Sequence, residues 1–478
     1  MQCVPNDGLA WIADENCGVF VSAGRGSAEG SGTKDAPLNS LQEAVARARQ
    51  MTGRVYACAG EGEGFDEAVD VPSGVTVYGG FDCGNDWLWI GDTTKTTLTA
   101  APGTIPLTMQ GIPGVVHIED VHVFAQPGSQ ETKETVSSIA AIALSTNVEL
   151  VRCMLEARDA ALGANGAPPL YPPAVAPAGL AGGDACSRED GGDVAGGRTV
   201  RNDCDTTGDL SDDSVGGKGG DGRMSEGYDG ASGEPRVSAD DERNGGHGHE
   251  AGETALCDPG DPGKSRDAGM PGADATGRGA ISAAGYAGVA GMTGGRGMPG
   301  QGGGGGGGER GASEGSRNCG GFRSRAGAGG GSGGAGGCGG AGGRGGLPGG
   351  ASIALVSIDA VLSFNEVILK SAKGGNGGNG GEGQQGGEGG AGGPGGTVPM
   401  NSEGIFAGCA GGSGGRGGNG GKGGGGQGGH SLGIAFLGQE PPTEGVEIYH
   451  GTVGRGGTGA SPDRRGADGV AMDVLGFN

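Results

Sequence analysis

The sequence holds one short run that could do acid–base or metal chemistry. It is His117-Ile118-Glu119-Asp120-Val121-His122, which offers two imidazoles and two carboxylates. If the run is a strand, alternation puts His117 and Glu119 on one face, where a metal ion or an acid–base pair is geometrically possible. A solvated strand face is the alternative. A second group, His247-Gly248-His249-Glu250, could bind a metal weakly, but a polar loop explains it better. We therefore expect no catalytic residue, no metal ion and no cofactor.

Two other groups of residues indicate binding rather than catalysis. Each interrupts a glycine tract with apolar, aromatic or basic side chains, at a place where the chain would reverse. Exposed aromatic and arginine residues on a rigid support are typical of binding loops. The alternative is that they pack over the end of a bundle as a cap. The residues are Val398, Met400, Ile405 and Phe406 in the 397–409 interruption, and Phe322, Arg323 and Arg325 in the 318–325 interruption.

The chain carries 11 cysteines, which favours an oxidising compartment. Cys3 and Cys17 bracket one short segment and Cys58 and Cys83 bracket another, so local disulfides are expected there. Zinc is the alternative, although no CxxC pair occurs. The odd total leaves at least one thiol free or intermolecular, and the remaining connectivity stays open. The first residues show no signal-peptide pattern, and the cysteines favour a signal that was removed from an extracellular or cell-surface protein.

The composition excludes several classes of protein. Of 478 residues, 123 are glycine and 23 are proline, while aromatic residues make up 4% and charged residues 18%. This fits neither a coiled coil nor an ordinary enzyme with a large core. No apolar run of about 18 residues occurs, so we expect no membrane-spanning helix. The net charge of −24 would repel nucleic acid and an anionic membrane surface.

The elements that would position the candidate groups begin in residues 1–158, which hold all three tryptophans. Ser40-Leu41-Gln42-Glu43 is a capping box that predicts the start of a helix, and Gly53 ends it. Short apolar runs separated by turns then predict strands, at 19–22, 55–59, 69–71, 75–78, 115–118 and 121–124. Their spacing predicts an all-β fold, a short parallel β-solenoid capped by one helix.

Three later segments look like copies of one two-strand unit. They begin at Ser138-Ile139-Ala140, Ser352-Ile353-Ala354 and Ser431-Leu432-Gly433. Glycine tracts lie between the copies, so we expect the tracts to leave and re-enter the solenoid at equivalent corners. The predicted layout is a capped β-helix at 1–158, a glycine-rich insertion at 159–350, a rung at 351–372, a glycine-rich hairpin at 373–430, and a terminal rung and tail at 431–478.

The glycine tracts keep a period of three. The pattern is Gly-Gly-X over 330–346, 374–396 and 411–422, and one glycine in three over 285–303. A polyproline-II type helix has three residues per turn, so Gly-Gly-X leaves two faces bare for close backbone contact. Helices with two glycine faces suit the middle of a bundle, and helices with one glycine face suit its edges. The alternative is a disordered linker, while the proline content is too low for collagen.

The first part resembles a known bacterial type. The resemblance lies in Val19-Phe20-Val21-Ser22, Ala36-Pro37-Leu38-Asn39-Ser40-Leu41, Val55-Tyr56-Ala57-Cys58 and Val75-Thr76-Val77-Tyr78-Gly79-Gly80-Phe81. These segments look like the pectin-lyase-like right-handed β-helix domains of secreted surface proteins of Gram-negative soil bacteria, many of which carry glycine-rich repeats downstream. The resemblance covers residues 17–158 and implies an extracellular protein, mostly without assigned activity, so no catalytic residue is carried over.

The glycine tracts resemble two kinds of polyglycine-II bundle, in glycine-rich antifreeze proteins and in phage tail-fibre tip adhesins. Charged residues at the X positions argue against an ice-binding face; they are Glu382, Glu388, Arg416 and Lys422. We therefore expect a non-enzymatic structural or adhesive protein whose tip loops contact a surface glycan or protein. A β-helix polysaccharide lyase or hydrolase is the alternative, although few charges fall on the recognisable strands. The oligomeric state stays open.

Overall fold

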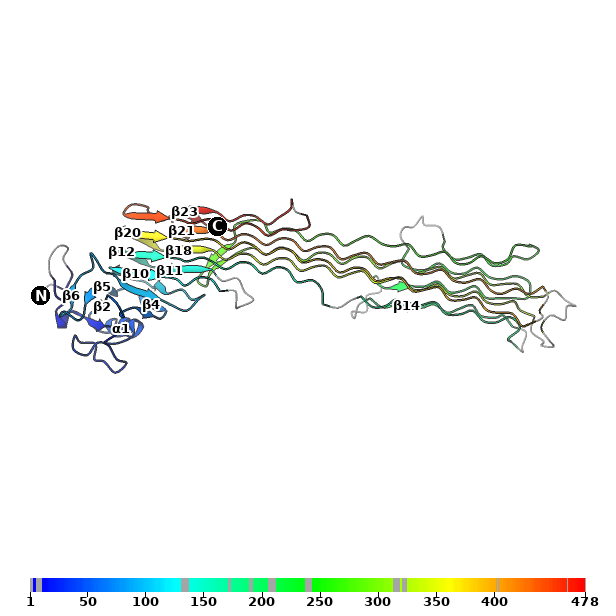
Figure 1. Cartoon of the computed structure of the whole chain (residues 1–478), viewed down its shortest axis with the longest axis horizontal. Coiled ribbons are helices and arrows are strands. Elements are labelled where there is room, and N and C mark those ends of the chain that lie inside the picture. Colours follow the sequence, from blue (N-terminus) through cyan, green and yellow to red (C-terminus); the bar gives the residue numbers. More distant parts are fainter. Residues whose placement is uncertain are drawn as a thin grey trace.

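The computed structural model describes residues 3–5, 11–129, 137–170, 173–188, 192–204, 212–236, 243–312, 319, 325–400, 402, 404–461 and 463–477. The molecule is long and narrow, with most of its strands gathered at one end and a bundle of extended segments running away from them (Figure 1). We call the strand-rich end the head and the bundle the shaft. The shaft comprises residues 159–350, 373–430 and 451–470.

The head consists of parallel sheets, which confirms the expected all-β class. Sheet 1 has the order β1 (Val19–Val21), β2 (Arg54–Cys58), β5 (Thr76–Asp82), β9 (Val115–Glu119), β12 (Asn147–Val151) and β19 (Val361–Asn365), with β6 (Leu88–Trp89) antiparallel to β5. Sheet 2 has β22 (Val446–Tyr449), β20 (Val367–Lys370), β13 (Met154–Glu156), β10 (Val121–Phe124), β7 (Thr96–Thr99) and β3 (Phe65–Asp66). Sheet 3 has β23 (Ala471–Gly476), β21 (Ser431–Leu437), β18 (Ser352–Ile358), β11 (Ser138–Leu144), β8 (Leu107–Gln110) and β4 (Val69–Pro72).

Most successive strands visit the sheets in turn, and three of the corners between sheets 1 and 2 are made by one residue, or by Arg152 and Cys153 together. Asp120, Arg152 and Glu366 each connect sheet 1 to sheet 2 with φ of 56°, 47° and 57°. This left-handed conformation is uncommon for residues other than glycine, so the local sequence gives little warning of it. Because one residue can turn the chain into another sheet, a continuous apolar run contains two strands.

The three expected copies lie in register. Ser138 pairs with Ser352, and Ser352 pairs with Ser431, which confirms that the copies are equivalent. The first copy contains two strands as expected, β11 and β12, and so does the third, β21 and β22, whereas the second contains three, β18, β19 and β20. Its second apolar run is divided by the corner at Glu366.

Helix α1 (Leu41–Ala48) covers one end of the head, where it contacts β1, β2 and β4. The 3-10 turn η1 (Glu15–Cys17) precedes β1 in the chain. The buried residues of α1 are Leu41, Ala44, Val45 and Ala48, at the expected helical spacing. The Ser40 hydroxyl accepts the Glu43 amide at 3.2 Å. Glu67, from a distant segment, accepts the amides of Leu41 and Gln42, so the second half of the cap comes from tertiary structure and not from Glu43.

The shaft segments hydrogen-bond to one another through their backbones. Between 326–350 and 408–430 the donor amides are Gly334, Gly337, Gly340, Gly343 and Gly346, and the acceptor carbonyls are Gly412, Gly415, Gly418, Gly421 and Gly424, at 2.9–3.0 Å. The bonds recur at every third residue, as the sequence period predicts. Segment 326–350 also bonds to 159–185, 214–223, 289–312 and 373–396, which places it in the middle of the bundle.

A shaft segment has more glycines per turn where more of its faces pack against neighbouring segments. Gly302 to Gly308 is continuous glycine, and every residue of it is buried. Its amides donate in rotation to three neighbouring segments, at Glu234, Gly334, Asp261, Ala231, Gly331 and Asp258. With every face in contact, no position has room for a side chain, because Cβ atoms would meet neighbouring carbonyl oxygens.

The distal shaft is thickened by shorter segments between 192 and 257, including the hairpin of β14 (Arg201–Asn202) and β15 (Ser214–Val215). A second hairpin, β16 (Ala280–Ser282) and β17 (Gly285–Ala287), lies where the shaft meets the head. A further short excursion occupies 451–470, a region that we expected to be a rung and tail. There Gly454 and Gly457 donate to the carbonyls of Gly429 and Gly426.

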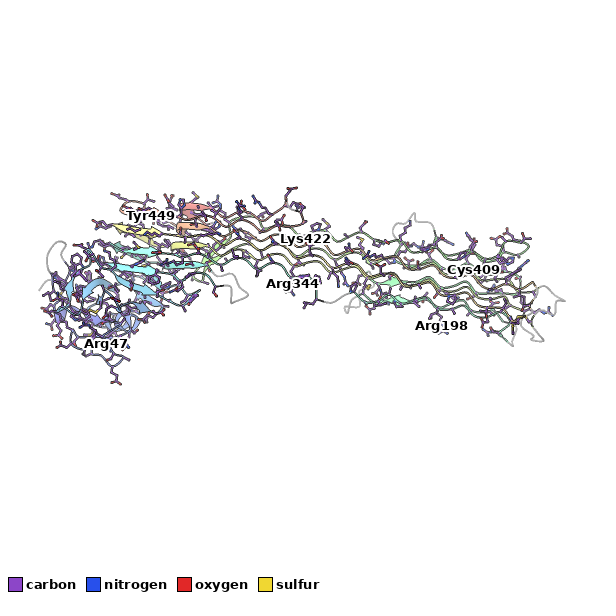
Figure 2. The ribbon with its side chains drawn as sticks, viewed as in Figure 1. Arg47, Arg198, Arg344, Cys409, Lys422 and Tyr449 are labelled. Atoms are coloured by element: carbon purple, nitrogen blue, oxygen red, sulfur yellow. A yellow bond between two sulfur atoms is a disulfide. The ribbon has the colours of Figure 1, made fainter. Side chains whose placement is uncertain are left out.

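Five disulfides join described cysteines: Cys3–Cys17 and Cys58–Cys83 in the head, and Cys186–Cys319, Cys204–Cys338 and Cys257–Cys409 in the shaft. Of the described cysteines, Cys153 is unpaired and buried. The side chains along the shaft project outward from the packed backbones (Figure 2).

Candidate functional site

The chemistry-bearing run lies at a corner of the head. Strand β9 ends at Glu119, Asp120 makes the turn, and β10 begins at Val121. The corner therefore sends His117 to sheet 1 and His122 to sheet 2. The two imidazoles are not brought together, because the left-handed turn at Asp120 intervenes.

Asp120 is the centre of a buried charged group that we call the corner cluster: Trp89, Lys95, Glu119, Asp120 and Arg152. The Asp120 carboxylate accepts the Trp89 indole N–H at 2.9 Å, the Lys95 ammonium at 2.7 Å and the Arg152 guanidinium at 3.0 Å. Arg152 also pairs with Glu119 and lies 5.2 Å from the Trp89 ring centroid. Because each charge has a partner, the cluster stabilises the corner instead of leaving a free acid or base.

His117 lies between two carboxylates, as strand alternation predicts for Glu119. Its Nε2 is 3.0 Å from Glu119 Oε2, and its Nδ1 is 2.9 Å from Glu149 Oε2 on the neighbouring strand. Burial lowers the pKa of His117, but hydrogen bonds to Glu119 and Glu149 outweigh it, so the pKa lies above its ordinary value. The contacts describe an imidazolium paired with carboxylates.

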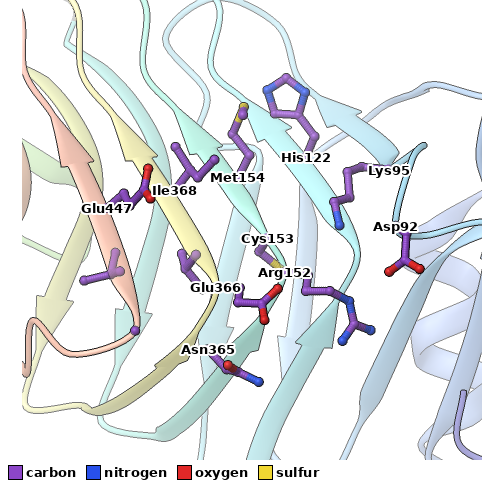
Figure 3. Close-up of a pocket in the computed structure, with 13 residues that line it drawn as sticks. Asp92, Lys95, His122, Arg152, Cys153, Met154, Asn365, Glu366, Ile368 and Glu447 are labelled. Atoms are coloured by element: carbon purple, nitrogen blue, oxygen red, sulfur yellow. The ribbon is translucent and has the colours of Figure 1, made fainter. Parts of the chain in front are cut away.

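His122 faces an open cavity of about 740 Å³ on the outer side of sheet 2 (Figure 3). Its Nε2 lies 3.3 Å from Glu156 Oε2 without hydrogen-bond geometry. Burial, the largest influence, lowers its pKa. His122 pairs in register with Met154, and Met154 with Ile368, so neighbouring strands line the cavity in a row.

The cavity combines an apolar floor with charged margins. Met154, Ile368 and Val446 supply apolar surface, and the margins carry Asp92, Lys95, Arg152, Glu366 and Glu447. The buried thiol of Cys153 is unreactive at neutral pH, because burial raises its pKa to about 12. This arrangement suits binding of a neutral or mixed-charge group. Lys95 and Arg152 were not expected at this site, because no local sequence pattern distinguishes them.

At the far end of the shaft, the predicted tip residues divide into two sets. Ile405 is buried with Ala185, Ala312 and Ala328, and Val398 packs against this group, as a cap would. The Cys186–Cys319 disulfide lies in the same cluster. Met400 is 95% exposed and Phe406 43% exposed, as binding residues would be. Phe322 and Arg323 fall outside the described residues, and Arg325 is half-buried.

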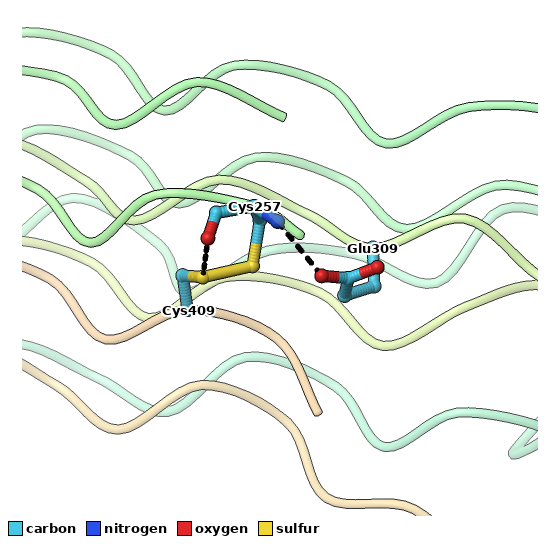
Figure 4. Close-up of side chains that lie close together, drawn as sticks. All are labelled: Cys257, Glu309 and Cys409. Carbon is cyan, nitrogen blue, oxygen red and sulfur yellow. Dashed lines mark hydrogen bonds between the residues drawn. A yellow bond between two sulfur atoms is a disulfide. The ribbon is translucent and has the colours of Figure 1, made fainter. Parts of the chain in front are cut away.

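A second buried group of hydrogen-bonded polar side chains lies beside the Cys257–Cys409 disulfide (Figure 4). Glu309 accepts the Cys257 amide at 2.8 Å and pairs with His249 Nδ1 at 2.5 Å. His249 was expected in a polar loop but is buried, because its partner lies in a distant segment. Glu309 and the two sulfur atoms are close enough to share a metal ion. However, the sulfurs are bonded to each other and offer no thiolates.

Comparisons with known proteins gave no match to a family model, to a curated protein or to a solved structure. Within the described part of the chain, every helix is too short or too polar to cross a membrane.

Proposed function

We propose that the protein is a non-enzymatic structural or adhesive protein of the cell surface or extracellular space, whose shaft displays binding loops. The observation that carries this proposal is the tip, where Met400 and Phe406 stand exposed beside the buried Ile405. Exposed apolar groups next to an anchored residue are suited to contact a partner. The five disulfides favour an oxidising, extracellular setting.

In this proposal the head is a short right-handed parallel β-helix and the shaft is a polyglycine-II bundle. Three parallel sheets visited in turn support the first part. Backbone hydrogen bonds at every third residue support the second. The shaft acts as a stiff spacer that holds the tip away from the head. The partner of the tip is a glycan or protein surface, since the net charge of −24 disfavours nucleic acid.

Replacement of both exposed tip residues tests the proposal. In the variant Met400→Ser/Phe406→Ser, binding of labelled protein to Gram-negative cells and to a glycan array should fall about tenfold or more. Met51→Ser, an exposed methionine of the head, is the matched control and should bind like the wild type. Equal binding by the tip variant and the wild type would refute the adhesive role of these residues.

A polysaccharide lyase or hydrolase is the second candidate, favoured by the cavity on sheet 2. Its charged margin includes Lys95 and Arg152, but both are held by Asp120. Incubation with polygalacturonate and with neutral polysaccharides should therefore give no unsaturated or reducing ends above background. Turnover that is lost in a His122→Asn variant would establish the enzyme and overturn the non-enzymatic proposal.

A further inference from the structure

The buried group beside the Cys257–Cys409 disulfide contains an acidic side chain that the cross-link itself does not require. Glu309 is fully buried, and one of its carboxylate oxygen atoms and the two sulfur atoms lie within 4.8 Å of one another (Figure 4). Acidic side chains are almost never fully buried without partners, because burial removes their hydration. Among the described residues, no other disulfide has an acidic side chain or an imidazole so close to both of its sulfur atoms.

The place of Glu309 in the chain makes its burial more unusual. It directly follows Gly302 to Gly308, where every residue is buried and no Cβ atom would fit. At the next position the bundle accommodates a long acidic side chain in its interior. The carboxylate accepts the Cys257 amide at 2.8 Å, but this bond does not explain the choice of residue, since most other amides of the shaft donate to backbone carbonyls.

His249 fixes the orientation of this carboxylate. Its Nδ1 lies 2.5 Å from Oε2 of Glu309, and its Nε2 lies 3.2 Å from the carbonyl oxygen of Glu253. A carbonyl oxygen can only accept, so Nε2 is the donor of that bond. In metal sites a ligating carboxylate is itself hydrogen-bonded by a second residue, which holds it in position. Glu309 thus has the surroundings of a metal ligand, and His249 those of its positioning residue.

We propose that Cys257, Cys409 and Glu309 bind a zinc ion when the disulfide is reduced, so that metal holds this crossing of the shaft before oxidation and the disulfide holds it afterwards. Two thiolates and a carboxylate form a donor set that Zn²⁺ accepts in tetrahedral geometry, with Zn–S distances of about 2.3 Å. Donor atoms around such an ion lie about 3.6–3.8 Å apart, a separation that the three side chains reach by small side-chain rotations. The fourth position is left to water.

The two states differ by two electrons and two protons. A dithiol reductant is oxidised to its own disulfide, while Cys257 and Cys409 each gain one electron and one proton. Zinc binds as both thiols lose their protons, so the reduced chain releases two protons for each ion that it takes up. A disulfide oxidant that accepts two electrons from the thiolates, together with two protons, re-forms the cross-link and frees the ion.

The length of the loop explains why this pair would use a metal. Every disulfide forms from thiols, and the chain has 11 cysteines that could pair wrongly. Cys257–Cys409 has the largest sequence separation of the five described disulfides, 152. Its two cysteines meet least often in the unfolded chain, because the entropic cost of closing a loop grows with its length. A zinc ion on both thiolates keeps this pair together until an oxidant joins them.

Cobalt binding by the reduced full chain tests the proposal, because Co²⁺ in a tetrahedral thiolate site gives absorption bands that Zn²⁺ lacks. The chain is reduced with tris(2-carboxyethyl)phosphine, freed of reductant without oxygen, and titrated with Co²⁺. We expect thiolate-to-cobalt bands from one ion per chain, which an equal amount of Zn²⁺ removes. The oxidised chain should give no such bands, because its sulfur atoms are bonded to each other.

Three variants identify the ligands. Glu309→Gln keeps an acceptor for the Cys257 amide but removes an anionic ligand, so the affinity for Co²⁺ should fall at least about 10–100-fold. Cys257→Ser/Cys409→Ser should abolish the bands. The matched control is Cys3→Ser/Cys17→Ser, which removes a disulfide of the head and should bind Co²⁺ like the wild type.

Hydrogen exchange of the glycine amides in 411–430 separates metal binding from loss of the fold. Zinc should raise their protection in the reduced wild type and should leave it unchanged in Cys257→Ser/Cys409→Ser. A reduced wild type that binds no cobalt, whether its shaft is folded or not, would overturn the proposal. Equal affinity in Glu309→Gln and the wild type, or bands that persist without the two cysteines, would overturn it as well.

Discussion

At the scale of single residues, the corner cluster stabilises the turn between sheets 1 and 2. Asp120 accepts three charged or polar donors from Trp89, Lys95 and Arg152, and it does so in a left-handed conformation. Buried charges of this kind are costly to leave without a partner.

We therefore predict that Asp120→Ala destabilises the head by about 3–5 kcal/mol, because it removes the buried carboxylate that Arg152 and Lys95 share. Asp120→Asn keeps a residue that tolerates positive φ and keeps one acceptor, so its loss should be smaller. Denaturant unfolding followed by tryptophan fluorescence measures both. Equal losses in the two variants would show that the charge of Asp120 is unimportant.

The paired His117 predicts a dependence of stability on pH. Since its pKa is raised in the folded state, its contribution is fully present below its unfolded pKa of about 6.5 and is lost as pH rises through the folded pKa. The contribution should be below about 1 kcal/mol, because Glu149 is half exposed. His122 and His430 have lowered pKa values, so their contributions to stability change with pH in the opposite direction. The contribution of His117 is therefore measured as the difference between the wild type and a variant that lacks this histidine.

Melting temperatures of wild type and His117→Gln should therefore differ most at acidic pH and converge above neutrality. A constant difference across this range would contradict an ionised His117 in the folded state.

At the scale of elements, the shaft relies on glycine positions that face another backbone. A Cβ at Gly337 would collide with the carbonyl oxygen of Gly387, and the Gly337 amide donates to Gly415. The exposed Ala391 lies at an X position of the same bundle and offers a matched control.

Gly337→Ala should destabilise the shaft by about 2–4 kcal/mol, from overpacking and a distorted hydrogen bond. Ala391→Ser should have little effect. Hydrogen exchange of the glycine amides in 374–396 and 411–430 measures the change, since these amides should be strongly protected in the wild type. Exchange at the free-chain rate in the wild type would contradict the hydrogen-bonded bundle.

Much of the arrangement of these elements could be predicted from the sequence, and some of it could not. The α1 face, most strands, the three equivalent copies and the three-residue period follow from local patterns in the sequence. The corners at Arg152 and Glu366 could not be predicted, because a left-handed arginine or glutamate leaves no local signature. His249 was misjudged for a related reason: Glu309, which buries it, is 60 residues away in the chain. The tip prediction stayed incomplete, because a row of apolar residues cannot show that Ile405 faces inward and Met400 outward.

At the scale of the whole molecule, long-range disulfides stabilise the distal shaft. Cys204–Cys338 closes a loop with a sequence separation of 134, whereas Cys3–Cys17 in the head spans 14. In the chain-entropy view, longer loops gain more from a disulfide.

Removing Cys204–Cys338 by serine substitution should therefore cost about 2–5 kcal/mol and expose the short segments between 192 and 257 to proteases. Removing Cys3–Cys17 should cost less and leave the shaft resistant. Limited proteolysis with mass spectrometry identifies the first cleavage sites. First cleavage in the head of the Cys204→Ser/Cys338→Ser variant would contradict the stabilising role of this disulfide.

The repeating hydrogen bonds have a consequence for how such a molecule can change over generations. Each extended segment of the shaft repeats the same backbone hydrogen bonds to its neighbours after every three-residue turn. Inserting three codons therefore moves the segment forward by one turn and restores an equivalent set of hydrogen-bond partners. Inserting one or two codons would instead turn side chains toward neighbouring backbones. Since each excursion begins and ends at the head, matched triplet insertions in adjacent arms would lengthen the reach of the tip without altering the head. The length of the shaft can therefore change by mutation in steps of one three-residue turn.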